Sequence, residues 1–120
     1  MLSLLALALI SGRVTAITDG DTFRIGATRV RLAHIDANEM HGGCHTVCAP
    51  RSARAARDNL ARLALGKHVV CRQTGTSYRR IVAECSVDGV DIGCAQLRGG
   101  FAIDWARYDR HGRYTRRCGL

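Results

Sequence analysis

The stretch RVTAITDGDTFRIGATRVRLAHI, residues 13–35, decides the fold. Its short runs of β-branched and apolar residues are separated by two turn signals, Asp19-Gly20 and residues 26–28. In the last run, Val30 and Leu32 alternate with arginines, which places the apolar side chains on one face of a strand. The stretch therefore predicts two successive hairpins, which make a three-stranded antiparallel meander.

Residues 50–67, PRSARAARDNLARLALGK, change the period from strand to helix. Four apolar residues recur there at helical spacing: Ala53, Ala56, Leu60 and Leu63. Pro50 suits the first helical position, and Gly66 is a typical stop signal. The arginines avoid the apolar stripe, so we expect a helix that keeps them in solvent.

The rest of the chain predicts two more strands and a second helix. HVVCRQ (68–73) and RIVAECSV (80–87) flank a polar loop, and IGCAQLRGG (92–100) is typical of a short helix closed by glycines. The order of the elements predicts an α+β fold, mainly β. It is compatible with a small five-stranded barrel that carries two or three helices.

Composition bounds the kind of protein. A chain of 120 residues with 47% hydrophobic residues is long enough for one domain and too short for two. Its 18 basic and 10 acidic residues give a positive field that attracts polyanions such as nucleic acid or an anionic membrane. All but one of the basic residues are arginine, which suits phosphate but is equally well explained by a compositional bias of the source.

The N-terminal segment and the cysteines indicate an oxidising compartment. Residues 1–11 begin with MLSLLALALI, which resembles the apolar part of a secretory signal but lacks a basic start and a clear cleavage site. It is shorter than the roughly 20 residues that span a bilayer, so we expect no membrane span. The alternative is a hydrophobic first strand or helix of the domain, which we otherwise assign to 12–120. Six cysteines fit secretion or a periplasmic location.

The six cysteines also fit a disulfide framework. Cys71 and Cys85 flank the predicted hairpin symmetrically, so they are candidates for facing positions. Cys44 and Cys48 are candidates for a bond that closes a small loop. Cys94 and Cys118 are candidates for a bond that holds the C-terminus. Six cysteines allow 15 pairings, and the sequence leaves the choice among them open.

The stretch HGGCHTVC, residues 41–48, offers zinc as an alternative to a disulfide. His41, Cys44, His45 and Cys48 are all residue types that bind zinc. However, a spacing of three residues between cysteines is not the commonest in structural zinc sites. Such sites usually draw their second ligand pair from farther along the chain. We therefore favour the disulfide loop.

Carboxylates and arginines at strand ends are the candidates for chemistry. Asp21, Asp36 and Glu39 lie close to predicted strand ends, where their oxygens can converge on a hard cation such as Ca²⁺. Arg31 lies on the strand that leads to Asp36, and Arg80 begins a later strand. Carboxylates, a divalent cation and two guanidinium groups together can bind a phosphodiester and stabilise the charge of its transition state.

Several motifs then resemble a known family. ITDGDTF, RVRLAHIDANE, YRR followed by IVAEC, and VDGVDI followed by LRGGFA occur in the order and approximate spacing of the staphylococcal nuclease (thermonuclease) family. The resemblance runs from about Gly12 to Ala102. It implies a five-stranded oligonucleotide-binding (OB-fold) barrel with helices and a Ca²⁺-dependent phosphodiesterase that acts on DNA and RNA.

The resemblance also implies roles for individual residues. The calcium ligands of the family match Asp21, Asp36 and the backbone carbonyl of Ala37. Arg31 and Arg80 match the two arginines that bind the scissile phosphate. Glu39 matches the residue that activates water, and Tyr78 matches a tyrosine that holds a substrate phosphate. We expect DNA and/or RNA as substrate, a monomer, and no stable protein partner. The alternative is a catalytically weak or inactive nucleic-acid-binding module of the same fold.

The chain departs from the family pattern at three places. Asn38 stands where the family commonly has proline, which removes a stiff element next to the catalytic glutamate. Arg79 replaces a glycine, which implies strain if its φ is positive. The last segment is short, so we expect a truncated final helix, with Trp105 or Tyr108 as the aromatic residue that stacks on a base.

Overall fold

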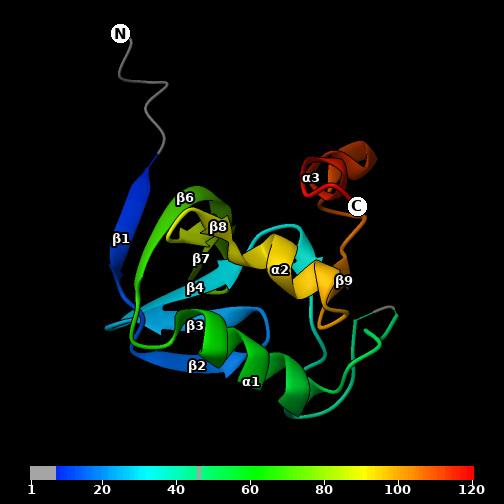
Figure 1. Cartoon of the computed structure of the whole chain (residues 1–120), viewed down its shortest axis with the longest axis horizontal. Coiled ribbons are helices and arrows are strands. Elements are labelled where there is room, and N and C mark those ends of the chain that lie inside the picture. The colour runs from blue at the N-terminus through cyan, green and yellow to red at the C-terminus, as the bar shows by residue number, and fades with distance from the viewer. Residues whose placement is uncertain (1–7, 46) are drawn as a thin grey trace, which may run out of the picture.

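The structure is a computed structural model that describes residues 8–45 and 47–120, and it is α+β, mainly β (Figure 1). Its main sheet is mixed and has seven strands in the order β1-β6-β7-β4-β3-β2, with β8 paired to β7. These strands are β1 (Leu9–Arg13), β2 (Ala16–Asp19), β3 (Thr22–Ile25), β4 (Thr28–Leu32), β6 (His68–Ser77), β7 (Arg80–Val87) and β8 (Val90–Asp91). Between the described residues, the pairings do not show a closed barrel.

The predicted meander is confirmed. Strands β2, β3 and β4 pair antiparallel in that order, and Phe23 faces both Ile17 and Val30 in the register. All three of these side chains belong to the hydrophobic core. Alternation has therefore placed one face of the meander against the core, as the sequence predicts.

Strand β4 continues the sheet by a parallel pairing with β7, and β7 pairs antiparallel with β6. The parallel pairing needs a long crossover, and α1 (Ala53–Ala64) lies within it. In the β6–β7 hairpin, Cys71 lies directly opposite Cys85, and the two form a disulfide. The hairpin prediction for this cysteine pair is confirmed.

The first described strand lies partly within the N-terminal segment 1–11. Residues 1–7 of the proposed N-terminal segment 1–11 lie outside the described residues. Residues 9–11 belong to β1, which pairs antiparallel with β6. The sheet therefore begins before Gly12, because Ile10 packs against the core beside β6.

Helix α1 is confirmed, but it begins later than Pro50. Ser52 is its N-cap, and the hydroxyl of Ser52 accepts a hydrogen bond from the Ala55 backbone N–H. Three of its side chains are buried in the core: Ala56, Leu60 and Ala64. The helix packs against β2 and against α2 (Ile92–Arg98). Gly66, with a φ of 78°, lies just beyond its end.

The predicted strand through residues 29–35 is broken in the structure. Strand β4 ends at Leu32, and a turn at Ala33 and His34 follows, with a φ of 72° at His34. The chain then enters the two-residue strand β5 (Ile35–Asp36), which pairs with β9 (Ile103–Asp104) in a separate small sheet. This turn redirects the chain just before Asp36.

The C-terminal part consists of short elements: the 3₁₀ helix η2 (Arg110–Gly112) and α3 (Arg113–Arg117). Helix α3 has five residues, so the last helix is short. Cys118, just beyond it, forms a disulfide with Cys94 of α2. Among the described residues, every helix is too short or too polar to cross a membrane.

Candidate functional site

Arg31 lies at the centre of a buried ionic cluster. Its Nη2 is 3.1 Å from Asp36 Oδ1 and 3.4 Å from Asp21 Oδ2, and all three residues are buried. Arg31 comes from β4, Asp36 from β5, and Asp21 from the turn that precedes β3. The break after Leu32 makes this contact possible, because it turns Asp36 back toward the arginine.

The guanidinium of Arg31 is held in place by further contacts. Its Nη1 donates hydrogen bonds to the carbonyl oxygens of Leu32, at 2.7 Å, and Ile35, at 2.9 Å. Its Cζ lies 4.6 Å from the centre of the Trp105 ring, a cation–π distance. Carboxylates, carbonyls and an aromatic face thus fix the orientation of one positive group.

Asp21 is held on both of its oxygens. Oδ1 accepts a hydrogen bond from the Thr22 hydroxyl, and Oδ2 accepts one from the backbone N–H of Ala37 at 2.9 Å. Burial raises the pKa of Asp21 above its ordinary value, although the neighbouring Arg31 charge acts in the opposite direction. One guanidinium therefore does not fully offset the loss of water around this carboxylate.

The donor set fits a hard cation such as Ca²⁺ in its chemistry. Asp21 and Asp36 offer carboxylate oxygens and Ala37 a backbone carbonyl, and Ca²⁺ prefers oxygen ligands. A cation here would favour the charged form of Asp21, which burial disfavours. Among the residues that the structure describes, no group of three or more His, Cys, Asp or Glu side chains is placed to hold a metal ion.

Gln96 is a buried residue that the sequence did not single out, and it fixes the turn that carries Asp21. Its side-chain amide donates hydrogen bonds to the carbonyl oxygens of Gly20, at 2.7 Å, and Ala56, at 3.0 Å. Its Oε1 accepts one from Asn59 at 2.6 Å. A lone glutamine in a short helix has no sequence signal for this role.

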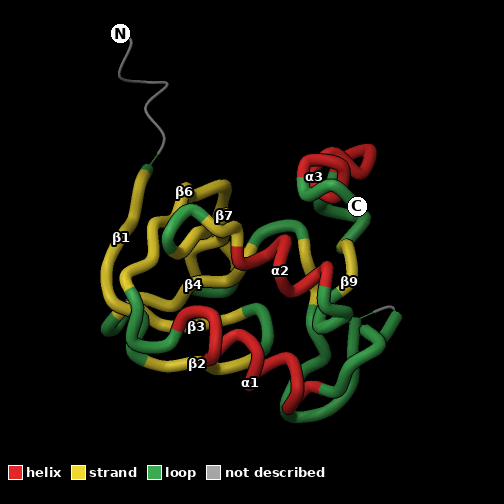
Figure 2. The backbone as a smooth tube through the Cα atoms, viewed as in Figure 1, coloured by secondary structure: helices red, strands yellow, loops and turns green. Residues whose placement is uncertain are grey.

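The long loop between β5 and α1, drawn in green in Figure 2, is fastened at Asn38. The Asn38 amide nitrogen donates to the carbonyl oxygens of Ala49, at 3.1 Å, and Arg51, at 2.9 Å. Its Oδ1 accepts from the Ala49 backbone N–H at 2.8 Å. Asn38 therefore ties the two ends of the loop together, where the family pattern would have a proline.

We expect Asn38→Ala to lower the free energy of unfolding by about 1–3 kcal/mol, because it removes all three hydrogen bonds. Asn38→Asp should be at least as destabilising, since a carboxylate would then face two carbonyl oxygens. Urea unfolding of the oxidised protein measures both variants. A smaller loss in the aspartate variant than in the alanine variant would contradict this clamp.

His45 connects the two carboxylates of this loop region. Its Nδ1 lies 3.0 and 3.1 Å from the two oxygens of Asp36, and its Nε2 lies 3.6 Å from Glu39 Oε1. Its ring stacks on Trp105 with ring centres 4.9 Å apart. Glu39 itself is half exposed, with 51% of its side chain accessible. The sequence marked His45 only as a possible zinc ligand.

The zinc alternative is not formed in this structure. Cys44 and Cys48 are joined in a disulfide, so neither offers a thiolate to a metal. The three bonds are Cys44–Cys48, Cys71–Cys85 and Cys94–Cys118, which are the pairs considered from the sequence. Three disulfides in so short a chain indicate an oxidising compartment.

Arg80 and Tyr78 lie at the tip of the β6–β7 hairpin. The Arg80 side chain donates hydrogen bonds to the carbonyl and hydroxyl of Ser77. Burial, and then the positive charge of Arg31, lower the pKa of Arg80 from its ordinary value. Tyr78 is 86% exposed. Arg79 has a φ of 66°, so the strain expected there is present.

The predicted site residues are therefore brought together unequally. The structure places Arg31 against Asp21 and Asp36, and the backbone N–H of Ala37 on Asp21. Glu39 joins them through His45, and Arg80 lies close enough for its charge to interact with Arg31, Asp21 and Glu39. Tyr78 projects into solvent from the hairpin tip.

A pocket of about 360 Å³ lies beside Arg31. Trp105 and Tyr108 are its aromatic lining residues, and Thr74–Ser77 of β6 also line it. Trp105 and Tyr108 also pack edge to face, with ring centres 4.6 Å apart. The two aromatic residues considered for base stacking thus line one pocket next to the buried arginine.

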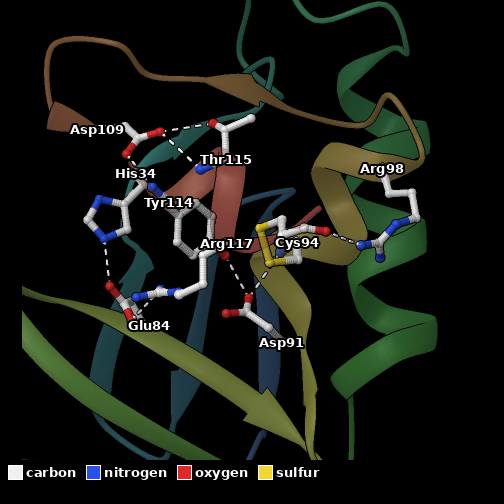
Figure 3. Close-up of a disulfide and its surroundings, with 10 residues drawn as sticks. His34, Glu84, Asp91, Cys94, Arg98, Asp109, Tyr114, Thr115 and Arg117 are labelled. Atoms are coloured by element: carbon white, nitrogen blue, oxygen red, sulfur yellow. Dashed lines mark hydrogen bonds and ion pairs between the residues drawn. A yellow bond between two sulfur atoms is a disulfide. The ribbon is translucent and has the colours of Figure 1, made fainter. Parts of the chain in front are cut away.

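Glu84 joins His34 to Arg117 of the C-terminal part (Figure 3). His34 Nε2 lies 2.8 Å from one Glu84 oxygen, and Arg72 and Arg117 each donate to the other at 2.7 Å. Burial raises the pKa of Glu84, but hydrogen bonds from Arg72 and His34 outweigh it and lower the pKa from its ordinary value. The His34 Nδ1 also meets the carbonyl of Tyr108 at 3.0 Å.

Comparisons with models of protein families and with curated protein sequences find no significant match to this chain.

Proposed function

We propose that this chain is a Ca²⁺-dependent nuclease that hydrolyses phosphodiester bonds of DNA and/or RNA. The observation that carries the proposal is the buried contact of Arg31 with Asp21 and Asp36, beside Arg80 and Glu39. A buried ionic cluster of this kind adds little to stability compared with apolar side chains of the same volume. The same groups are suited to bind a cation and a phosphate together.

Arg31 and Arg80 would grip the scissile phosphate. Guanidinium groups match phosphate oxygens in a planar, bidentate way and remain charged at neutral pH. Arg31 is preorganised by its contacts with Leu32, Ile35 and Trp105, so it would lose little freedom when substrate binds. Tyr78, exposed at the hairpin tip, would hold a neighbouring phosphate of the strand.

Asp21, Asp36 and the Ala37 carbonyl would hold Ca²⁺, which supplies positive charge that polarises the phosphate. Glu39 would orient the attacking water or accept its proton, since its half-exposed carboxylate is accessible to water. In this proposal, one set of groups binds the cation and the phosphate, and Glu39 activates the water.

The finer description of the fold and compartment belongs to the same proposal. The meander β2-β3-β4, the parallel pairing of β4 with β7, and the hairpin β6–β7 support a five-stranded OB-fold barrel. The three disulfides support a secreted or periplasmic location. The pocket of Trp105 and Tyr108 would stack one base next to the bound phosphate.

We expect Glu39→Gln to lower the rate of Ca²⁺-dependent cleavage by about 10²- to 10⁴-fold, because glutamine cannot accept a proton from water. The assay follows oxidised protein on single-stranded DNA and RNA, with Ca²⁺ or with chelator. Asp58→Asn, which neutralises an exposed carboxylate on α1, is the matched control and should cleave normally. Cleavage by Glu39→Gln at the control's rate would remove Glu39 from the proposed chemistry.

A nucleic-acid-binding module without cleavage is the second candidate. It is favoured by the engagement of both Asp36 oxygens by His45 and by the contact of Arg80 with Ser77. The same assay decides between the two, because binding of nucleic acid without cleavage in Ca²⁺ would contradict the enzyme and leave the module.

A further inference from the structure

His45 occupies one particular edge of the Asp36 carboxylate. Its Nδ1 is nearly equidistant from the two oxygens, at 3.0 and 3.1 Å, so it lies across the edge between them. Both partners are acceptors, so Nδ1 carries the hydrogen in either charge state of the ring. Arg31 Nη2 takes a further position on Oδ1 at 3.1 Å. Asp36 therefore receives donors from two sides.

The edge between two carboxylate oxygens is also where a cation binds when both oxygens are its ligands. A hydrogen on His45 Nδ1 and a cation cannot share that edge, because both are positive and both need the same lone pairs. The other ring nitrogen lies 3.6 Å from Glu39 Oε1. The imidazole thus lies between the proposed cation ligand Asp36 and the proposed water-activating group Glu39.

We propose that His45 is a built-in competitor of the cation at Asp36, and that cation binding displaces it. This inference rests on the proposed function only through the cation site. In the state described here, His45 lies between Asp36 and Glu39 and covers the edge of Asp36. When the cation takes the carboxylate edge, the ring leaves, and Glu39 loses its contact with the imidazole at the same step.

The surroundings of His45 explain how the ring is held and how it returns. The His45 ring stacks on Trp105, and Trp105 in turn makes a cation–π contact with Arg31. His45 also lies inside the ring closed by the Cys44–Cys48 disulfide, which limits how far it travels when displaced. The chain therefore keeps the competitor at high local concentration beside its target.

The test measures cation binding directly, without nucleic acid. Ca²⁺ is titrated into the oxidised protein by calorimetry and followed by the fluorescence of Trp105, the one tryptophan of the chain. His45→Ala should bind Ca²⁺ about tenfold more tightly than wild type, the factor expected from removing one hydrogen bond to a charged group. In wild type, Ca²⁺ should change Trp105 fluorescence as His45 unstacks, and in His45→Ala this change should be lost.

Two further variants sharpen the result. His41→Ala, an exposed histidine of the same loop, should bind Ca²⁺ like wild type and keep the fluorescence change. His45→Asn keeps an N–H near Asp36, so it should remain closer to wild type than His45→Ala does. Unchanged Ca²⁺ binding by His45→Ala would overturn the inference. Weaker binding would also overturn it, because His45 would then be a ligand of the cation.

Failure of the nuclease proposal gives a different pattern. Tighter Ca²⁺ binding by His45→Ala without any cleavage would support the competitor and contradict the enzyme. Cleavage with unchanged Ca²⁺ affinity in His45→Ala would support the enzyme and contradict the competitor. No binding of Ca²⁺ by either protein would overturn both the cation site and its competitor.

Discussion

Arg31→Met is expected to lower the free energy of unfolding by about 3–5 kcal/mol, measured by urea unfolding with chelator present. Arg31 lies within 3.4 Å of Asp21 and 3.1 Å of Asp36, and all three are buried. Methionine has a similar length without the charge, so two buried carboxylates would be left without a counter-charge. Cleavage should also fall by at least about 10²-fold, the loss typical of one preorganised donor to the reacting oxygen.

The charge argument can be separated from packing by restoring neutrality. In the Arg31→Met background, Asp21→Asn together with Asp36→Asn removes the unpaired charges and should recover most of the lost stability. Arg24→Met, on the neighbouring strand β3, is the control and should change stability by less than about 0.5 kcal/mol. No recovery in the triple variant would mean that Arg31 stabilises the fold through packing and not through charge.

Local sequence signals account for the parts of the fold that depend on neighbours in the chain. The turn at Asp19-Gly20, the alternation of Val30 and Leu32, and the helical spacing of residues 53–64 each report on a local structure. All three appear in the structure. The sequence predicts that α1 begins at Pro50, whereas it begins at Ala53, because Ser52 is the residue that caps it.

Local sequence signals do not predict the break in the strand at His34. The run RVRLAHI alternates well enough to continue as one strand, yet His34 takes a φ of 72°, and its ring contacts Glu84 and Tyr108. Both partners are far away in sequence. The positive φ turns the chain toward Arg31, so the geometry of the site depends on a contact that no local pattern reveals.

The candidate site was predictable in its residue types but not in its connections. Asp21, Arg31 and Asp36 lie close to strand ends, and acidic and basic residues there favoured a cation and phosphate site. His45 was noticed for its metal-binding type, whereas its contacts with Asp36 and Glu39 depend on how the 37–49 loop folds back. Asn38 and the Cys44–Cys48 bond determine that path.

Removing the Cys94–Cys118 disulfide as Cys94→Ser/Cys118→Ser is expected to lower the free energy of unfolding by about 3.5 kcal/mol. This bond closes a loop with a sequence separation of 24 residues, and the loss of chain entropy in the unfolded state grows with loop length. Figure 3 shows it beside the hydrogen bond from the Tyr114 hydroxyl to Asp91, 2.6 Å long. The C-terminal segment would then be held by non-covalent contacts alone, among them the backbone hydrogen bond from Trp105 to the His34 carbonyl.

The second measurement is the rate of limited proteolysis within residues 105–120, which depends on the contacts that remain. The segment keeps the ion pair of Arg117 with Glu84 and the hydrogen bond from Arg98 to the Cys118 carbonyl, both partly exposed and therefore weak. We expect cleavage there to become faster in the double variant.

Cys44→Ser/Cys48→Ser is the matched control, because its bond spans a separation of only 4 residues and should cost about 2 kcal/mol by the same relation. It should leave the C-terminal segment protected. Equal losses of stability in the two double variants would contradict the loop-length argument. Unchanged proteolysis would mean that Glu84 and Asp91 hold the C-terminus, and with it Trp105 beside Arg31, without the disulfide.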